Sequence, residues 1–205
     1  MTLRRPLCDQ LGIAHPIILA PIGDAAVPEL AAAVSEAGGL GMLAMTGLEP
    51  EQILERLEAT RALTVRPFGV NLILHAEQRA QLETCLEAGV KIVSYFWRLL
   101  EPGNPYIDQA HAASALVMLT VGSADEARRA VDAGVDIIVA QGVEAGGHIW
   151  GTVSTLPLVP AVVDAVSPIP VVAAGGIGDG RGLAAVLALG AQAGWLGTRF
   201  LLADE

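Results

Sequence analysis

Short apolar runs alternate with amphipathic stretches along the whole chain. Each apolar run is almost free of polar residues, as is typical of a strand that is covered on both faces of a parallel sheet. One run, 68–74, carries the polar residue Asn71, whose side chain must find a partner once it is buried. The pattern predicts eight strands, at residues 16–22, 40–45, 68–74, 90–97, 115–121, 135–140, 169–174 and 193–202.

The stretches between these runs repeat their apolar residues at helical spacing. In the stretch 50–63 we expect Ile53, Leu54 and Leu57 to face inward, with Pro50 in the first helical turn. Glycines follow several of these stretches, as they often follow the ends of helices. The pattern predicts seven helices, at residues 27–37, 50–63, 77–88, 105–113, 123–133, 156–166 and 181–189.

A repeated junction supports one fold for the whole chain. Residues 86–93 and 131–138 show the same passage from a helix through glycine into a strand. Eight strands alternating with seven helices predict a (β/α)₈ barrel, a single domain over residues 1–205 that lacks its last helix and is C-terminally incomplete. An open doubly wound sheet is the alternative, but Pro21-Ile22-Gly23-Asp24 stands after the first strand where a dinucleotide fingerprint would stand.

Composition narrows the class of protein. The chain is 53% hydrophobic with a mean hydropathy of +0.53, which is enough apolar surface for a substantial core. Its net charge of −10 argues against binding to nucleic acid or to an anionic membrane surface. Cys8 and Cys85 have no metal-ligand or CxxC spacing, and no apolar stretch is long enough to span a bilayer. We therefore expect a cytoplasmic enzyme in a reducing compartment; homo-oligomerisation stays open.

Two glycine-rich segments fall at neighbouring strand ends of the predicted barrel. Residues 175–180, which begin with Gly175 and Gly176, follow the seventh strand and open a helix. Trp195, Leu196, Gly197 and Thr198 close the eighth strand. Backbone N–H groups at such loops, together with the helix dipole, can hold a phosphate, and these two loops are the usual phosphate site of a barrel. Simple tight turns are the alternative reading.

Polar side chains at two other strand ends complete the predicted site. Asn71 and Gln141 each offer a donor and an acceptor, which suits the edge of a planar heterocycle, although either could be a satisfied core amide. The loop 141–148, with Gly146 and Gly147, lets backbone approach a ligand and carries His148 at its tip. His148 is a candidate general base or ligand contact; a surface histidine is the alternative.

Other reaction classes have no support in the sequence. His15, His75 and His111 show no HxxxH or facial-triad spacing with one another, so we expect no metal site. No serine lies in a GxSxG elbow, which argues against serine hydrolysis. Glu144 is read as a loop acid that positions backbone or faces water, and Cys85 as a packing residue.

With these residues in view, the sequence resembles the nitronate monooxygenase family, formerly called 2-nitropropane dioxygenases, which are FMN-dependent (β/α)₈ enzymes. The resemblance covers essentially the whole chain and rests on six segments, residues 20–22, 28–41, 67–71, 141–148, 173–182 and 196–200. It implies that FMN is held by backbone at Pro21, Ile22 and Gly23, by Asn71 and Gln141 at the isoalloxazine, by Gly146, and by phosphate contacts from Gly175, Gly176, Trp195, Leu196, Gly197 and Thr198. His148 matches the family's active-site histidine.

The resemblance implies a reaction in which an alkyl nitronate is oxidised with O₂ to a carbonyl compound and nitrite. His148 would deprotonate a neutral nitroalkane or hold the anionic nitro group. The residues Ile149-Trp150-Gly151 depart from the arginine and glycine that many relatives carry after the histidine. Two alternatives remain: the related FMN-dependent enoyl-ACP reductase, which uses NAD(P)H, and a barrel that binds flavin or phosphate without turnover.

Overall fold

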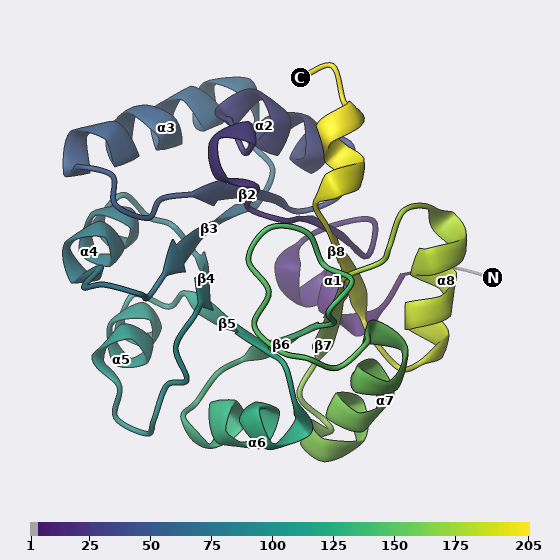
Figure 1. The fold of residues 1–205 in the computed structure, drawn as a ribbon. Coiled ribbons are helices and arrows are strands. Elements are labelled where there is room, and N and C mark those ends of the chain that lie inside the picture. The colour runs from purple at the N-terminus through teal and green to yellow at the C-terminus, as the bar shows by residue number, and fades with distance from the viewer. Residues whose placement is uncertain (1–3) are drawn as a thin grey trace.

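The structure is a computed structural model that describes residues 4–205 (Figure 1). Its eight strands form one parallel sheet in the order β1-β8-β7-β6-β5-β4-β3-β2. A bridge between Ile18 and Leu40, with a hydrogen bond from Leu19 N to Leu40 O of 2.9 Å, joins β1 to β2 and nearly closes the ring. The strands are β1 (Ile17–Leu19), β2 (Gly41–Ala44), β3 (Phe68–Ile73), β4 (Ile92–Phe96), β5 (Leu116–Val121), β6 (Ile137–Gln141), β7 (Val171–Ala174) and β8 (Ala193–Leu196).

Helices surround this ring, which confirms the predicted (β/α)₈ barrel (Figure 1). All seven predicted helices are present, within a few residues of their predicted bounds. They are α2 (Pro28–Glu36), α3 (Pro50–Leu63), α4 (Arg79–Glu87), α5 (Pro105–Ala112), α6 (Ala124–Asp132), α7 (Thr155–Val166) and α8 (Gly180–Ala188). Two 3₁₀ helices, η1 (Gly23–Ala25) and η2 (Thr198–Leu202), follow β1 and β8.

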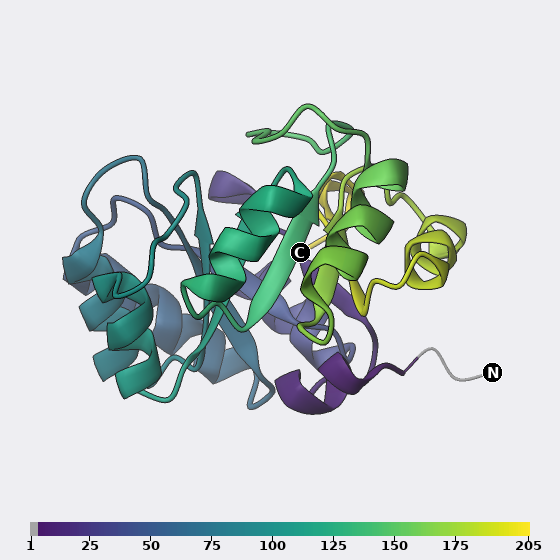
Figure 2. The same cartoon turned by 90° about the horizontal axis from the view of Figure 1, so that it is seen from below.

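The sequence did not predict the first helix, α1 (Pro6–Leu11). Its residues Leu7, Cys8 and Leu11 are buried in the same cluster as Ile18 and Met42, which lie on the barrel strands. Figure 2, in which the strand β6 runs upward, shows α1 at the bottom and the loop after β6 standing above the strand ends. The helix α1 therefore closes the N-terminal end of the barrel and leaves the C-terminal end free for a site.

Two sequence-based predictions were wrong in detail. The last strand ends at Leu196 instead of continuing to residue 202, because its neighbour β1 ends at Leu19 and offers no further backbone partners. In α3, Leu54 is 41% exposed, whereas Ile53 and Leu57 are fully buried against the barrel. The apolar face of α3 is therefore narrower than its sequence pattern indicated.

Two apolar layers hold the barrel together. One lies between the strands and the outer helices, and the other fills the barrel interior with residues such as Met42, Met118 and Val172. Among the buried residues of β3 and β4 are Asn71 and Ser94, which are paired in register. The Ser94 hydroxyl is buried without a hydrogen-bond partner. No helix within residues 4–205 is both long and apolar enough to cross a membrane.

Candidate functional site

A cavity of about 880 Å³ opens at the C-terminal end of the barrel, where the loops that follow the strands meet. In Figure 1 the loop between β6 and α7 passes in front of this barrel mouth. The structure brings every predicted site residue to this one cavity. They are Pro21, Ile22, Gly23, Asn71, Gln141, Gly146, His148, Gly175, Gly176, Trp195, Leu196, Gly197 and Thr198.

Free backbone donors line the β7–β8 side of the cavity. Within the described residues, the N–H groups of Gly176, Ile177 and Gly178 donate no hydrogen bond to the protein, and neither do those of Gly197 and Thr198. Gly176 has a positive φ of 72°, and a Cβ at Gly178 would meet no atom within 4 Å. Two adjacent loops therefore present unsatisfied donors to open space, which fits a phosphate group.

The N-terminus of α8 follows these donors directly and is capped by one of the protein's own side chains. Asp179 caps α8 by accepting hydrogen bonds from Arg181 N at 2.8 Å and Gly182 N at 3.4 Å. The Arg181 side chain and these backbone donors lower the pKa of the Asp179 carboxyl. The protein's own carboxylate thus occupies the helix end, and the free donors lie just upstream in the loop.

Asn71 is a buried amide without a partner. Its residue is 4% exposed and it lines the cavity, yet its side chain makes no hydrogen bond in the described part of the chain. Its amide atoms remain accessible from the cavity, where water or a bound ligand can pair with them. Its position between β2 and β4 at the cavity floor fits the polar edge of a heterocycle bound above the strands.

Gln141 uses part of its amide to brace the loop that follows β6. Its Nε2 donates to His148 O at 3.0 Å, and its Oε1 accepts from Trp150 N at 2.9 Å. The amide therefore has structural partners, which was the alternative reading of this residue. One N–H and one lone pair remain free, so its predicted contact with a heterocycle stays a prediction.

Aromatic side chains surround His148 at the rim of the cavity. The imidazole lies 4.4 Å from the Trp97 ring and is stacked with Phe96 at 6.4 Å and an interplanar angle of 20°. Trp97 has a φ of 73°, a left-handed conformation that is unusual for a bulky residue and is often found at functional sites. The indole of Trp150 donates to Glu126 Oε2 at 2.8 Å and so ties the loop to α6.

Several cavity residues were not found by sequence analysis. Phe96 and Thr120 lie at strand ends, and Arg56 reaches the cavity from the outer helix α3. A strand-end position could have suggested the first two, whereas nothing in the helical pattern marks Arg56.

Glu144 was read as a loop acid that positions backbone, and it accepts hydrogen bonds from Thr155 N at 2.8 Å and Thr155 Oγ1 at 2.9 Å. The hydrogen bond from the Thr155 N–H lowers the pKa of the Glu144 carboxyl.

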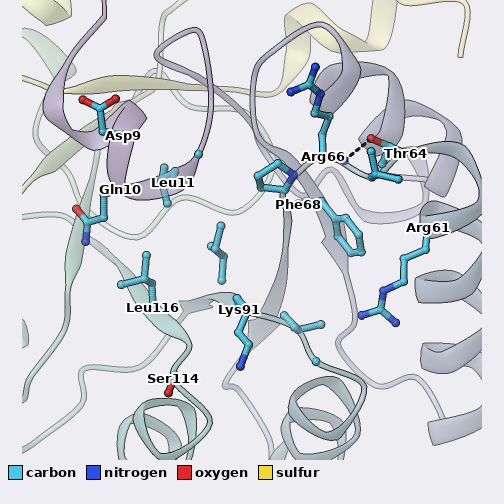
Figure 3. Close-up of a pocket in the computed structure, with 16 residues that line it drawn as sticks. Asp9, Gln10, Leu11, Arg61, Thr64, Arg66, Phe68, Lys91, Ser114 and Leu116 are labelled. Carbon is cyan, nitrogen blue, oxygen red and sulfur yellow. Dashed lines mark hydrogen bonds between the residues drawn. The ribbon is translucent and has the colours of Figure 1, made fainter.

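A second hollow, of about 830 Å³, lies at the opposite end of the barrel between α1 and the starts of β3, β4 and β5 (Figure 3). Two of its three cations, Lys91 and Arg61, are bonded to protein carbonyls. Lys91 Nζ donates to Ala113 O at 2.6 Å, and Arg61 Nη2 donates to Ala88 O at 2.5 Å. Because Ala88 and Ala113 cap the C-termini of α4 and α5, these cations complete helix ends.

Comparisons with known proteins place the chain in a family. The family model for nitronate monooxygenase matches residues 4–84 and 76–205. The chain is 38% identical to the nitronate monooxygenase of Pseudomonas aeruginosa, over 95% of this chain and 68% of that protein. It is 40% identical to the (3aS,4S,5R,7aS)-5-hydroxy-7a-methyl-1-oxo-octahydro-1H-indene-4-carboxyl-CoA dehydrogenase of Rhodococcus jostii, over 100% of this chain but only 57% of that protein.

A solved structure agrees with these sequence matches. FabK from Thermotoga maritima superposes with a TM-score of 0.89 at 42% identity, covering 97% of this chain and 62% of that one. The chain thus spans less than two thirds of the length of several relatives that it matches. On the family match over nearly all of its residues, the chain belongs to the nitronate monooxygenase family.

Proposed function

We propose that this protein is an FMN-dependent oxidoreductase that oxidises alkyl nitronates with O₂. Enzymes of its family are flavin-dependent. The observation that carries the proposal is the meeting of three features in one cavity: the free N–H groups after β7 and β8, the unpartnered amide of Asn71, and the imidazole of His148. In the balanced reaction, two nitronates and one O₂ give two carbonyl compounds and two nitrite ions.

The lining residues fit FMN as the flavin. The free N–H groups of residues 176–178 and 197–198 suit its single phosphate, and Asn71 and Gln141 suit the polar edge of its ring. Backbone at residues 21–23 and at Gly146 lines the walls between these two ends. When bound, the flavin supplies the electron-transfer chemistry that no side chain of the cavity can perform.

His148 would accept a proton from the substrate or bind its negative charge. Its imidazole stands at the cavity rim on a loop that Gln141 holds in place, with Phe96 and Trp97 against its ring. A neutral nitroalkane must lose its α-proton to become a nitronate, and an imidazole is suited to accept that proton near neutral pH. With a substrate that is already a nitronate, His148 would hold the anionic nitro group by donating a hydrogen bond.

The test is nitrite release by wild-type protein and by His148→Asn, with FMN content measured by absorbance. We expect wild type to release nitrite from a nitronate and from its neutral nitroalkane. The variant should keep its FMN and lose at least 100-fold in rate with the neutral nitroalkane. His75→Asn is the matched control, because His75 follows β3 at the same end of the barrel but does not line the cavity. Equal rates for wild type and His148→Asn would remove His148 from the reaction, and FMN binding without nitrite release would leave a barrel that binds flavin without turnover.

A second candidate function is oxidoreduction of an acyl thioester. It is favoured by the named activity of the Rhodococcus relative, a carboxyl-CoA dehydrogenase, and by FabK, an enoyl reductase. In this chain, Leu201 and Leu202 line the cavity and are 52% and 75% exposed, so the entrance has an apolar side that suits an acyl group. The NAD(P)H-dependent enoyl-ACP reductase is one form of this candidate.

Parallel assays distinguish the two functions. Under nitrogen, NADH oxidation with an enoyl thioester and no nitrite release from nitronates in air would favour the thioester reaction. Leu202→Asn should then raise KM for a long-chain thioester by about ten-fold, since it places a polar group on the apolar side. The same variant should leave turnover of a small nitronate within about two-fold, because it adds no charge and a small anion needs no apolar entrance.

A further inference from the structure

Arg56 is a cation of the cavity that has no carboxylate partner. It lies in the middle of α3, is half-buried, and lines the cavity wall. Its Nη1 donates to Ala44 O at 3.1 Å, and no carboxylate in residues 4–205 forms a salt bridge with it. The chain carries 22 acidic residues against 12 lysines and arginines, so carboxylates are abundant on its surface. The remaining N–H donors of Arg56 are therefore open to a ligand in the cavity.

The bond to Ala44 O fixes where the guanidinium lies. Ala44 ends β2 and is paired in register with Asn71 on β3. The free donors of Arg56 and the unpartnered amide of Asn71 therefore share one corner of the cavity. The neighbouring hydroxyl of Thr46 accepts a hydrogen bond from Ile73 N at 2.8 Å. An arginine has five N–H donors, so four remain after the bond to Ala44 O.

This corner lies across the barrel from the free N–H groups that suit a phosphate. In the ring of eight strands, β3 and β7 are four places apart and so stand on opposite sides. A ligand whose phosphate is held after β7 and β8 and whose body crosses the barrel mouth would place its far end beside Asn71 and Arg56. The far end should therefore be polar, planar and electron-rich.

We propose that Arg56 binds the pyrimidine edge of the flavin and raises its reduction potential. This inference rests on the flavin binding of the proposed function, but not on the nitronate substrate. Two-electron reduction adds two electrons and one proton at neutral pH, so the reduced flavin carries one more negative charge than the oxidised form. A guanidinium beside the ring edge stabilises that charge and therefore favours the reduced form.

The test is the reduction potential of the bound flavin in wild type, Arg56→Gln and Arg56→Lys, measured by dye equilibration during slow reduction. In Arg56→Gln, binding of reduced relative to oxidised flavin should fall by ten-fold or more, equivalent to about 30 mV for a two-electron couple. Arg56→Lys keeps the charge and should recover most of the difference. Arg61→Gln is the matched control, because Arg61 lies on the same helix but bonds to Ala88 O at the other end of the barrel.

Each outcome decides the proposal. An unchanged potential in Arg56→Gln overturns it, and so does an equal drop in Arg61→Gln, which would reflect net charge alone. If the potential is unchanged while KM for a nitronate rises ten-fold, Arg56 binds the substrate's anionic group instead of the flavin. Wild-type protein that binds no flavin overturns both this inference and the FMN assignment. Flavin binding with the predicted shift but without nitrite release supports Arg56 and rejects only the nitronate reaction.

Discussion

The two ends of the barrel carry hollows of similar size and opposite chemistry. The cavity at the C-terminal end measures about 880 Å³ and the hollow at the N-terminal end about 830 Å³. At the N-terminal end, Lys91 and Arg61 bond to helix carbonyls, and Thr64 donates to Glu36 Oε1 at 2.5 Å. At the C-terminal end, within the described residues, the amide of Asn71 and the N–H groups of residues 176–178 and 197–198 donate no hydrogen bond to the protein.

This contrast shows that volume alone does not identify a site. Folding normally pairs buried polar groups, because an unpaired one lowers the free energy of unfolding. Where unpaired groups from several strands face one space, water or a bound ligand must supply their partners. The N-terminal hollow lies between α1 and the strand starts, whereas the C-terminal cavity holds the unpaired amide and N–H groups that a ligand can satisfy.

The largest effect should come from a new charge at the phosphate loops. Gly178→Asp places a carboxylate beside the free N–H groups in a position with open space, so the fold should persist. Repulsion between the carboxylate and a phosphate should weaken FMN binding by about 100-fold, or ~2.7 kcal/mol. Fluorescence titration of FMN measures this.

Ser114→Asp is the matched variant, because it adds the same charge in the N-terminal hollow. Ser114 has a φ of 55°, a left-handed backbone conformation that aspartate tolerates. FMN affinity should stay within about two-fold in this variant. Equal losses in the two variants would contradict a phosphate site at the β7 and β8 loops.

A second pair of variants, one at each end of the barrel, should differ in its effect on the free energy of unfolding. Thr64→Val removes a buried hydroxyl that bonds to Glu36 and to Arg66 N, and should lower the free energy of unfolding by about 1–2 kcal/mol. Asn71→Leu removes an unpaired amide and should leave stability unchanged or raise it by up to about 1 kcal/mol, while FMN binding weakens. Urea unfolding of the flavin-free proteins gives both values. A larger loss in Asn71→Leu than in Thr64→Val would mean that Asn71 has a structural partner.

The local stability of the two ends of the barrel should also depend differently on pH. The pKa of Glu144 is lowered from 4.5 by its bonds from Thr155. Its contribution to stability is therefore fully present above the ordinary carboxyl pKa and is lost as the pH falls through the lowered value. The loop after β6 should then separate from α7 and become more open to proteolysis in acid. Glu144→Gln should show that susceptibility at pH 7 as well. The bonds from Arg61 and Lys91 in the N-terminal hollow go to backbone carbonyls and should not change over this range.

The smallest effect concerns two residues with left-handed backbone, one at each end. Ser114 and Trp97 have φ values of 55° and 73°. Ser114→Gly should raise the free energy of unfolding by about 0.5–1 kcal/mol, because glycine adopts this conformation without strain. Trp97→Gly gains the same relief but loses the ring contacts with His148 and Phe96, so its net change should lie within about 1 kcal/mol of zero. A gain in Trp97→Gly as large as in Ser114→Gly would show that the aromatic contacts contribute little.

The sequence predicted the barrel well because each βα unit repeats a local pattern. The helix 50–63 was predicted to the residue, since Pro50 begins it and Glu49 and Gln52 form its capping box. The helix α1 was missed because its apolar residues fill the barrel end, a role that only the closed barrel creates. The same holds for Leu54, whose exposure depends on how α3 lies against its neighbours.

The sequence predicted the site residues that follow strand ends. It did not predict those that reach the site from another element through a long side chain. Asn71, His148 and the glycine loops could be placed from the strand order, because parallel strands bring their C-terminal ends together. Arg56 enters from an outer helix through a long side chain, and Trp97 contacts His148 across two loops. Nor could the sequence distinguish a ligand-binding Gln141 from a loop brace, because one amide can serve either purpose.

The brace made by Gln141 has a kinetic consequence. A loop that contains Gly142, Gly146 and Gly147 would sample many conformations if it were free, and a ligand would have to select among them. The two bonds from Gln141 hold the loop in one conformation before any ligand arrives. The entropy of ordering is then lost during folding and not on binding, so association should depend on diffusion into an open mouth and not on a slow closing step.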